Sequence, residues 1–293
     1  MNGQCNAFYD WHNMSEKKSI LVISSTIGSG QVGLQAIAPG LRALSFEMIG
    51  LPTIWLSAHP AAFPEMGAPK GGPMPPEQML ESIDWLLAAG ALDNCAAILS
   101  GYMPSLEHVK ACAAIVDKVK ATVADVIYCC DPICGDHDRL YLPKSVANGL
   151  RATLLPRADI ATPNLFELQH LSGQTDTADM EALVSAARSL RCPHIVVTSA
   201  PAPQGRIATL AIGDEIHRCE TSSAPHVPHG MGDLFAALYL GLHLKGEGKA
   251  LGMATGTMAA IAGGQMSATS LPHGPLTLTP PSLQDKGFLP EPA

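Results

Sequence analysis

The chain has 293 residues, of which 47% are hydrophobic and 15% are charged, and its formal net charge is −8. These values are typical of a compact soluble protein, favour one large α/β domain over two smaller ones, and exclude a disordered chain. The net negative charge argues against a nucleic-acid partner.

The eight cysteines lack the paired Cys-x-x-Cys spacing of a structural zinc site, so we expect buried thiols. No secretory signal pattern opens the chain, which favours a reducing cytoplasm as its location. The most membrane-like segment, Leu251 to Ala262, is too short to span a bilayer and contains glycine and threonine. We therefore expect a buried helix there and no membrane partner.

Residues 1–18 are polar and aperiodic and are predicted to be an N-terminal extension. The domain itself, residues 19–270, is predicted to begin with a buried strand at Ser19–Ser25 and a helix over Val32–Glu47. Strands and helices then alternate, which predicts a mostly parallel central sheet flanked by helices on both faces. The further strands are expected near 52–57, 96–100, 125–130, 158–161 and 194–199, and the helices near 77–89, 105–121, 145–154, 164–171 and 177–190.

A β-hairpin is predicted late in the chain, because Ile207–Ile212 and Glu215–Cys219 are joined by the turn residues Gly213 and Asp214. Two helices, at about 231–245 and 249–266, are expected to close the domain.

The segment from Ala58 to Pro76 is crowded with proline and glycine, and we expect a long surface loop with a binding role. The Pro-rich tail, 271–293, is expected to run over the surface. In open sheets of this architecture, ligands bind outside the carboxyl ends of the strands. The polar motifs of this chain all fall at predicted strand ends.

The segment Pro228–Leu238 has two glycines and a carboxylate at the point where a loop turns into an apolar helix. Free N–H groups and the helix dipole favour an anion there, and glycine lets the ligand approach closely. Asp233 would lie beside that anion, able to take a proton from an attacking hydroxyl, as phosphoryl transfer to an alcohol requires. The alternative is structural, because an acidic residue in the first turn also stabilises a helix.

The sequence Gly28 to Gly33 matches Gly-x-Gly-x-x-Gly, the first part of a dinucleotide-binding fingerprint. The acid that would bind the ribose is missing, because the second strand ends in Trp55–His59 without a carboxylate. We prefer a glycine-rich first turn that lets a small substrate approach Ser25.

Asp131 and Asp136 follow the predicted strand Val126–Cys130, so their carboxylates should project from a strand end. Hard oxygen ligands of this kind could hold Mg²⁺, directly or through its waters. The alternative is an ordinary Asp-Pro turn with solvated acids.

Thr162, Asn164 and Glu167 follow another short strand and start a helix. The spacing of Asn164 and Glu167 is that of a capping box, which explains both residues structurally, whereas Glu167 could instead reach a metal-bound water. Thr198 and Ser199 end a further strand with hydroxyls suited to phosphate oxygens.

Two of the eleven histidines, His59 and His229, flank the expected cleft, and none has a metal-ligand spacing. The chain has neither a P-loop motif nor the Gly-x-Ser-x-Gly elbow of a serine hydrolase.

In their order along the chain, these motifs resemble the pyridoxal kinase branch of the ribokinase-like superfamily, over about residues 20–268. The points of resemblance are Ser100-Gly101-Tyr102, Asp131-Pro132-x-x-Gly135-Asp136 with Arg139 to Pro143, Ala158 to Leu168, Val197-Thr198-Ser199, and Gly230-x-Gly232-Asp233 with Leu234 to Ala237.

The resemblance implies a ribokinase-like single domain in a homodimeric cytoplasmic enzyme that phosphorylates the 5′-hydroxymethyl group of pyridoxal, pyridoxine or pyridoxamine with ATP, in vitamin B6 salvage. By position, Asp233 would be the catalytic base, and the amides of Gly230, Met231 and Gly232 would hold the migrating phosphoryl group.

The same resemblance implies that ATP binds with Mg²⁺, and it leaves a monovalent cation open. Asp131, Asp136 and Glu167 would organise the metal, and Thr162, Thr198 and Ser199 would contact the ATP phosphates. Asp131, Glu167, Gly230 and Gly232 also belong to the implied ATP site. Ser25 would bond the pyridine ring, in a substrate site shared with His59 and Asp233.

The chain departs from the family pattern on the substrate side. The first turn has Thr26, Ser29 and Gln31 where the family usually has His and Tyr, and Met231 replaces the usual threonine. The alternatives are therefore a related kinase for hydroxymethylpyrimidine, a sugar or a nucleoside, or a non-catalytic B6-binding protein on the same scaffold. A dehydrogenase resting on Gly28–Gly33 is a further alternative.

Overall fold

The computed structural model describes residues 18–136, 139–177, 179–246, 248–267 and 271. Nearly all of the predicted extension 1–18 and of the tail 271–293 lies outside the described residues. The described residues form a nine-stranded sheet in the order β11-β10-β9-β8-β5-β4-β1-β2-β3, together with the two-stranded hairpin β6-β7. The nine strands are β1 (Ser19–Ser29), β2 (Glu47–Ala58), β3 (Gly71–Pro73), β4 (Cys95–Ser100), β5 (Ile127–Cys130), β8 (Ile160–Ala161), β9 (His194–Pro201), β10 (Arg206–Ile212) and β11 (Ile216–Ser222).

The six central strands, β9-β8-β5-β4-β1-β2, are all parallel, and β3, β10 and β11 add antiparallel strands at the two edges. This confirms the predicted α/β fold, its mostly parallel sheet and the late hairpin.

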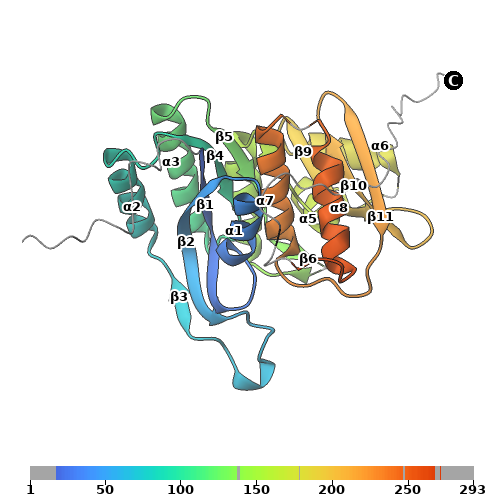
Figure 1. The fold of residues 1–293 in the computed structure, drawn as a ribbon, viewed down its shortest axis with the longest axis horizontal. Helices are drawn as coiled ribbons and strands as arrows, with labels where there is room; N and C mark the ends of the chain where they lie inside the picture. Colours follow the sequence, from blue (N-terminus) through green and yellow to red (C-terminus); the bar gives the residue numbers. More distant parts are fainter. Residues whose placement is uncertain (1–17, 137–138, 178, 247, 268–270, 272–293) are drawn as a thin grey trace, which may run out of the picture.

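Helices cover both faces of the sheet, as predicted (Figure 1). The face toward the viewer carries α1 (Leu34–Ala43), α7 (Met231–Leu244) and α8 (Ala250–Ala262). The other face carries α2 (Pro76–Ala88), α3 (Leu106–Thr122), α4 (Lys144–Gly149), α5 (Leu165–Ser172) and α6 (Met180–Arg188). Across the part of the chain that the structure describes, no helix has the length and apolar character needed to cross a membrane.

Strand β1 explains why the chain needs two helical layers. Leu21 and Ile23 face the core under α2 and α3, whereas Ile20 and Val22 face the core under α1 and α7, and all four are fully buried. Each such side chain contributes roughly 1.5–3 kcal/mol by leaving water. A continuous apolar run is therefore stable only when both faces are covered.

The predicted helix Val32–Glu47 was wrong at its end, because α1 stops at Ala43 and β2 begins at Glu47. The chain reverses at Ser45, which has a left-handed φ of 64°. Ser45 N–H donates to the carbonyl of Arg42 and Phe46 N–H to that of Leu41, each at 3.0 Å, which is the Schellman pattern that closes a helix.

The predicted loop Ala58–Pro76 was wrong in part. It contains the 3₁₀ turn Pro64–Met66 and the strand β3, which pairs antiparallel with β2. We call residues 59–70 the arm; Figure 1 shows it extending away from the body of the domain. A second unpredicted element is the small hairpin of β6 (Gly135–Asp136) and β7 (Arg139–Leu140).

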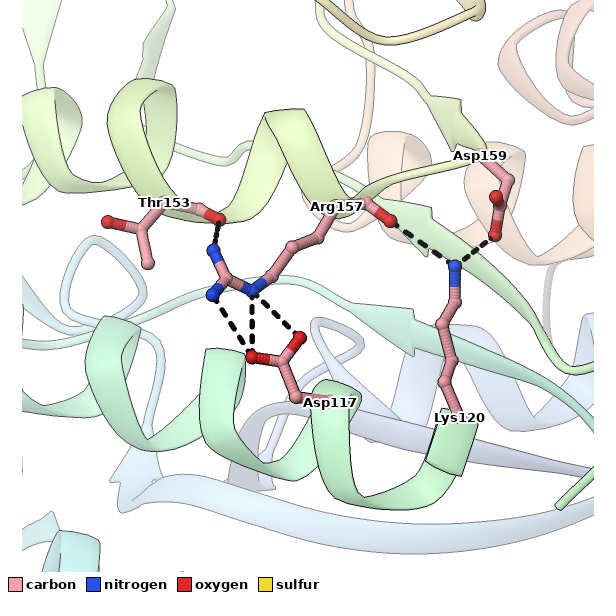
Figure 2. A network of polar contacts seen from close by, with 5 residues as sticks. All are labelled: Asp117, Lys120, Thr153, Arg157 and Asp159. Carbon is pink, nitrogen blue, oxygen red and sulfur yellow. Dashed lines mark hydrogen bonds and ion pairs between the residues drawn. The ribbon is translucent and has the colours of Figure 1, made fainter. Parts of the chain in front are cut away.

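A polar network ties α3 to the segment that leads into β8 (Figure 2). Lys120 Nζ donates to Asp159 Oδ2 at 2.6 Å, and the Arg157 guanidinium donates to Asp117 at 2.9–3.2 Å. Asp159 Oδ2 also accepts the backbone N–H of Tyr128 at 2.7 Å. The network therefore fixes the start of β5 against the start of β8, whose far ends carry polar motifs.

Candidate active site

Five neighbouring parallel strands end at one edge of the sheet, and the polar residues predicted from sequence follow them there. The strands are β1, β4, β5, β8 and β9. Because parallel strands have their carboxyl ends on the same side, side chains from distant parts of the sequence meet at this edge. Asp131 and Thr162 directly follow β5 and β8, whereas Ser25, Thr198 and Ser199 lie in the second halves of β1 and β9.

The start of helix α7 supplies backbone N–H groups to the same edge. Gly230 precedes the helix with a left-handed φ of 82°, and no side chain caps the helix. The first intrahelical bond runs from Leu234 N–H to Gly230 C=O, so the amides of Met231, Gly232 and Asp233 come before it. A Cβ added at Gly232 would meet nothing within 4 Å, so the turn has room for a ligand. Such a helix start is an anion-binding site.

Gly230 is required by packing as well as by its backbone angle. A Cβ at this position would lie 1.9 Å from the carbonyl oxygen of Gln31. The glycine loop before α7 is thus pressed against the turn between β1 and α1.

Asp233 is buried and its two carboxylate oxygens differ. Oδ2 accepts the backbone N–H of Gly33 at 3.0 Å, whereas the buried Oδ1 has no hydrogen-bond partner among the described residues. Burial raises the pKa of Asp233 to about 6, and the Gly33 bond opposes that rise. A carboxylate that titrates near neutrality, with one oxygen free, has the properties of a general base.

Asp131, directly after β5, is also buried, and its Oδ1 accepts the hydroxyl of Thr162 at 3.1 Å. Burial, and then the charges of Glu167 and Asp233, raise the pKa of Asp131 well above its ordinary value. These three acids therefore lie within electrostatic reach of one another. Their mutual repulsion favours a cation or a proton in this site.

Glu167 forms the predicted capping box of α5. Its Oε2 accepts the N–H of Asn164 at 3.0 Å, and Asn164 Oδ1 accepts the N–H of Glu167 at 2.8 Å. Its Oε1 accepts the N–H of Cys134 at 2.9 Å. Both oxygens are thus occupied by backbone donors, while burial raises the pKa of Glu167 to about 8.

The loops after β5, β8 and β9 are fastened to one another. Asn164 Nδ2 donates to the carbonyl of Gly135 at 2.9 Å, next to the half-buried Asp136, and Thr198 N–H donates to the carbonyl of Pro163 at 3.0 Å. Ser199 has a left-handed φ of 58° where the register of β9 against β10 shifts. This irregularity leaves Ser199 exposed at the edge of the site.

Ser25 lies where the register between β1 and β2 shifts, and it contacts Gly33 closely. A Cβ on Gly33 would be 2.5 Å from Ser25 Oγ. Because Gly33 also bonds Asp233, the serine lies near the base.

His59 follows β2 at the start of the arm, and its ring stacks on that of His229, with centroids 4.3 Å apart and planes 24° apart. Burial, and then the neighbouring His229, lower the pKa of His59. The stack joins the arm to the glycine loop that precedes Gly230.

Sequence reasoning missed two residues of the first turn. Gly33, whose N–H donates to Asp233, belonged to a glycine motif, but nothing in that motif indicated a hydrogen bond to a residue 200 positions away. Gln35, which bonds the end of β1, was not singled out at all.

The chain matches a known family of kinases. Residues 73–251 match the phosphomethylpyrimidine kinase family. A pyridoxal kinase of Deinococcus radiodurans is 36% identical over 242 residues, which are 78% of this chain and 80% of that protein. A pyridoxine/pyridoxal/pyridoxamine kinase of Bordetella avium is 32% identical over 226 residues, 74% of this chain and 75% of that protein.

Solved structures are also similar. A pyridoxal kinase from Leishmania donovani in complex with ADP and pyridoxamine superposes with a TM-score of 0.75 at 28% identity, covering 83% of this chain and 85% of that one. A pyridoxal kinase from Entamoeba histolytica shares the fold, with a TM-score of 0.77 at 23% identity. The superposition covers 87% of this chain and 92% of that one.

Proposed function

The chain belongs to the phosphomethylpyrimidine kinase family and groups with its pyridoxal kinases, and from this we propose that it transfers the γ-phosphoryl group of ATP to a B6 vitamer. The acceptor is the 5′-hydroxymethyl group of pyridoxal, pyridoxine or pyridoxamine, and the products are ADP and the vitamer 5′-phosphate.

The observation that carries the proposal is the buried Oδ1 of Asp233, which has no hydrogen-bond partner within the described part of the chain and belongs to the first turn of α7. In the proposed reaction this oxygen takes the proton of the acceptor hydroxyl, which becomes the nucleophile. The amides of Gly230, Met231 and Gly232 hold the migrating phosphoryl group, where their N–H dipoles stabilise its charge. Base and anion site are adjacent because Asp233 lies in the first turn of the same helix.

The ATP phosphates would contact the hydroxyls of Thr162, Thr198 and Ser199. The residues at this edge also fit Mg²⁺. Across the described residues, no three acidic, histidine or cysteine side chains form a complete metal cage. Yet Asp131 and Glu167 are buried acids whose charges repel, which suits an ion held by phosphates and water with few protein ligands.

In this arrangement Asp131 and Asp136 would hold Mg²⁺ or its waters, and Glu167 would orient the loop around it. Bound Mg²⁺ would neutralise the charge of the phosphates. Because the chain is itself acidic, that neutralisation is needed for ATP to bind beside three carboxylates.

The acceptor would lie between the first turn and the arm, with Ser25 bonding the pyridine ring and His59 beside it. This position puts the vitamer next to Asp233, because Ser25 and Asp233 both contact Gly33. The homodimer, the cytoplasmic location and any need for a monovalent cation stay predictions.

The test is ADP release from ATP and Mg²⁺ with pyridoxal, pyridoxine, pyridoxamine and hydroxymethylpyrimidine as separate acceptors. We expect turnover with at least one B6 vitamer and its loss when EDTA removes the metal. Faster turnover of hydroxymethylpyrimidine than of every vitamer would overturn the substrate assignment. Tight pyridoxal binding without ADP release would instead indicate a binding protein.

A further inference from the structure

The side chain of Gln35, in the first turn of α1, reaches back to the end of β1. Its Oε1 accepts the N–H of Ile27 at 3.2 Å, and its Nε2 donates to the carbonyl of Ile27 at 2.8 Å and to the hydroxyl of Thr26 at 2.7 Å. One side-chain amide thus pairs with both backbone groups of a single residue, as the N–H and C=O of a residue in a neighbouring antiparallel strand would.

The segment held in this way is irregular. The register of β1 against β2 shifts between Ser24 and Thr26, and α1 begins without a side-chain cap. The last two residues of β1, Gly28 and Ser29, and the two that follow, Gly30 and Gln31, are exposed, so they gain little stability from packing. Gln35 therefore adds three side-chain hydrogen bonds that join the start of α1 to the last part of β1.

Gly33 ends this turn and is confined between two site residues. It has a left-handed φ of 54°, and a Cβ there would lie 2.0 Å from the carbonyl oxygen of Ser25. Its N–H bonds Asp233 Oδ2. A displacement of the turn would consequently move this N–H and release the carboxylate of Asp233.

We propose that Gln35 is a positioning residue, which holds the first turn so that Gly33 orients Asp233 with Oδ1 toward the acceptor hydroxyl. This proposal rests on the proposed kinase function. Gln35 acts through Ile27, the turn and Gly33, because its side-chain amide is engaged by Ile27 and Thr26. Its effect is on the geometry of the base, and misplacing a reacting group by about 1 Å can cost on the order of 10²-fold in rate.

The main test compares Gln35→Leu with Gln169→Leu. Gln169 is a matched control, because its Nε2 also donates to a backbone carbonyl, that of Thr175, and to a threonine hydroxyl, that of Thr177, at the far end of α5. We expect Gln35→Leu to lower kcat about tenfold or more while KM for ATP changes less than about twofold. Gln169→Leu should lower Tm with kcat within about twofold of the parent.

Gln35→Glu is a second variant that keeps the acceptor oxygen for Ile27 N–H and removes the donors. At neutral pH its kcat should fall between those of the parent and Gln35→Leu, because the Ile27 N–H and the Thr26 hydroxyl can still donate to the carboxylate, whereas the Ile27 carbonyl loses its donor. Equal kcat losses in Gln35→Leu and Gln169→Leu, or a Gln35→Leu kcat within about twofold of the parent, would overturn the proposal.

Amide hydrogen exchange gives a readout that needs no turnover. In the parent, the bond to Asp233 should protect the Gly33 N–H, and in Gln35→Leu its exchange should be about tenfold faster or more. Unchanged protection would refute the positioning role even if the enzyme is active. A further outcome is that the parent releases no ADP with any acceptor while Gly33 still loses protection in Gln35→Leu. That result would refute the proposed kinase function and would support the inference that Gln35 holds the first turn.

Discussion

The backbone N–H of Gly33 and the Oδ2 of Asp233 form a 3.0 Å hydrogen bond across 200 residues of sequence. The bond fixes one carboxylate oxygen and leaves the other, Oδ1, buried and without a partner among the described residues. The carboxylate is therefore oriented before any substrate binds. An oriented base with a raised pKa is the basis of the first two predictions.

Asp233→Asn should lower kcat by about 10²–10⁴-fold, because the amide cannot take a proton but keeps the size and the Gly33 bond. KM for ATP should change little, since the helix amides remain. Steady-state ADP release measures both constants. Near-normal turnover of the variant would rule out the base role.

Activity should fall as the pH drops through about 6, because Asp233 must be unprotonated to act and burial raises its pKa to about 6. The free energy of unfolding should depend on pH in the opposite direction. A carboxyl whose folded pKa exceeds its unfolded value stabilises the fold fully only below the unfolded value, and that contribution is lost as pH rises through about 6.

Asp233→Asn should therefore be more thermostable than the parent at pH 8, and the gap should close near pH 4. Pairs of melting curves at the two pH values check this. For kcat/KM, the acid limb should be the same with two acceptors whose own pKa values differ, and a limb that follows the acceptor would contradict the assignment to Asp233.

Gly230→Ala and Gly232→Ala should separate stability from catalysis. At position 230 the left-handed φ and the 1.9 Å approach to Gln31 forbid a Cβ, so the variant should lose more than about 1 kcal/mol of unfolding free energy. At position 232 a methyl group meets no protein atom, and alanine should stabilise the helix start by up to about 1 kcal/mol.

The same Gly232→Ala methyl group would lie where the phosphoryl group approaches. We therefore expect a raised Tm together with a kcat/KM for ATP that is lower by about tenfold or more. Thermal melts and ADP release on one preparation give both numbers. A variant with raised Tm and unchanged kcat/KM would show that no ligand comes close to this amide.

His229→Val should raise KM for the vitamer several-fold, by about 1 kcal/mol, and leave KM for ATP unchanged. The reason is that His229 stacks on His59 and joins the arm to the glycine loop. His229→Phe keeps an aromatic ring and is the control that should restore KM. An equal rise in both KM values would point to a distortion of the glycine loop instead.

Asp159→Ala should be more destabilising than Asp117→Ala. Asp159 bonds Lys120 and also the backbone N–H of Tyr128, whereas Asp117 forms a surface ion pair with Arg157 (Figure 2). We expect losses of about 1–3 and about 0–1 kcal/mol in urea denaturation. Losses of the same size in the two variants would mean that the hydrogen bond between Asp159 and the Tyr128 N–H does not contribute to the free energy of unfolding.

Local sequence patterns predicted the parts of the fold that depend on neighbouring residues. The apolar run at the start of β1 predicted a strand buried on both faces, and the spacing of Asn164 and Glu167 predicted the capping box that forms. The alternation of strands and helices predicted which loops meet at the carboxyl edge.

Features that depend on unusual backbone angles or distant partners were not predictable. Ser45 ends α1 in a left-handed conformation that serine adopts rarely, and β3 is only three residues long. The bond between Gly33 and Asp233 depends on packing between distant parts of the chain, and the hydrogen bonds of Gln35 to Thr26 and Ile27 depend on how α1 packs against the end of β1. No local spacing of residues encodes such contacts. The family resemblance supplied roles for Ser25 and Asp233, but it gave no geometry.

The separation between Gly33 and Asp233 has a consequence for biosynthesis. A nascent chain can complete β1, α1 and most of the parallel sheet while residues after β9 are still being translated. The base and its orienting amide meet only when α7 has emerged and docked on α1. Contacts at such long range form late in folding. The base is therefore oriented only in a chain that has been translated beyond α7, whereas the strands that carry the other polar residues of the site are complete before then.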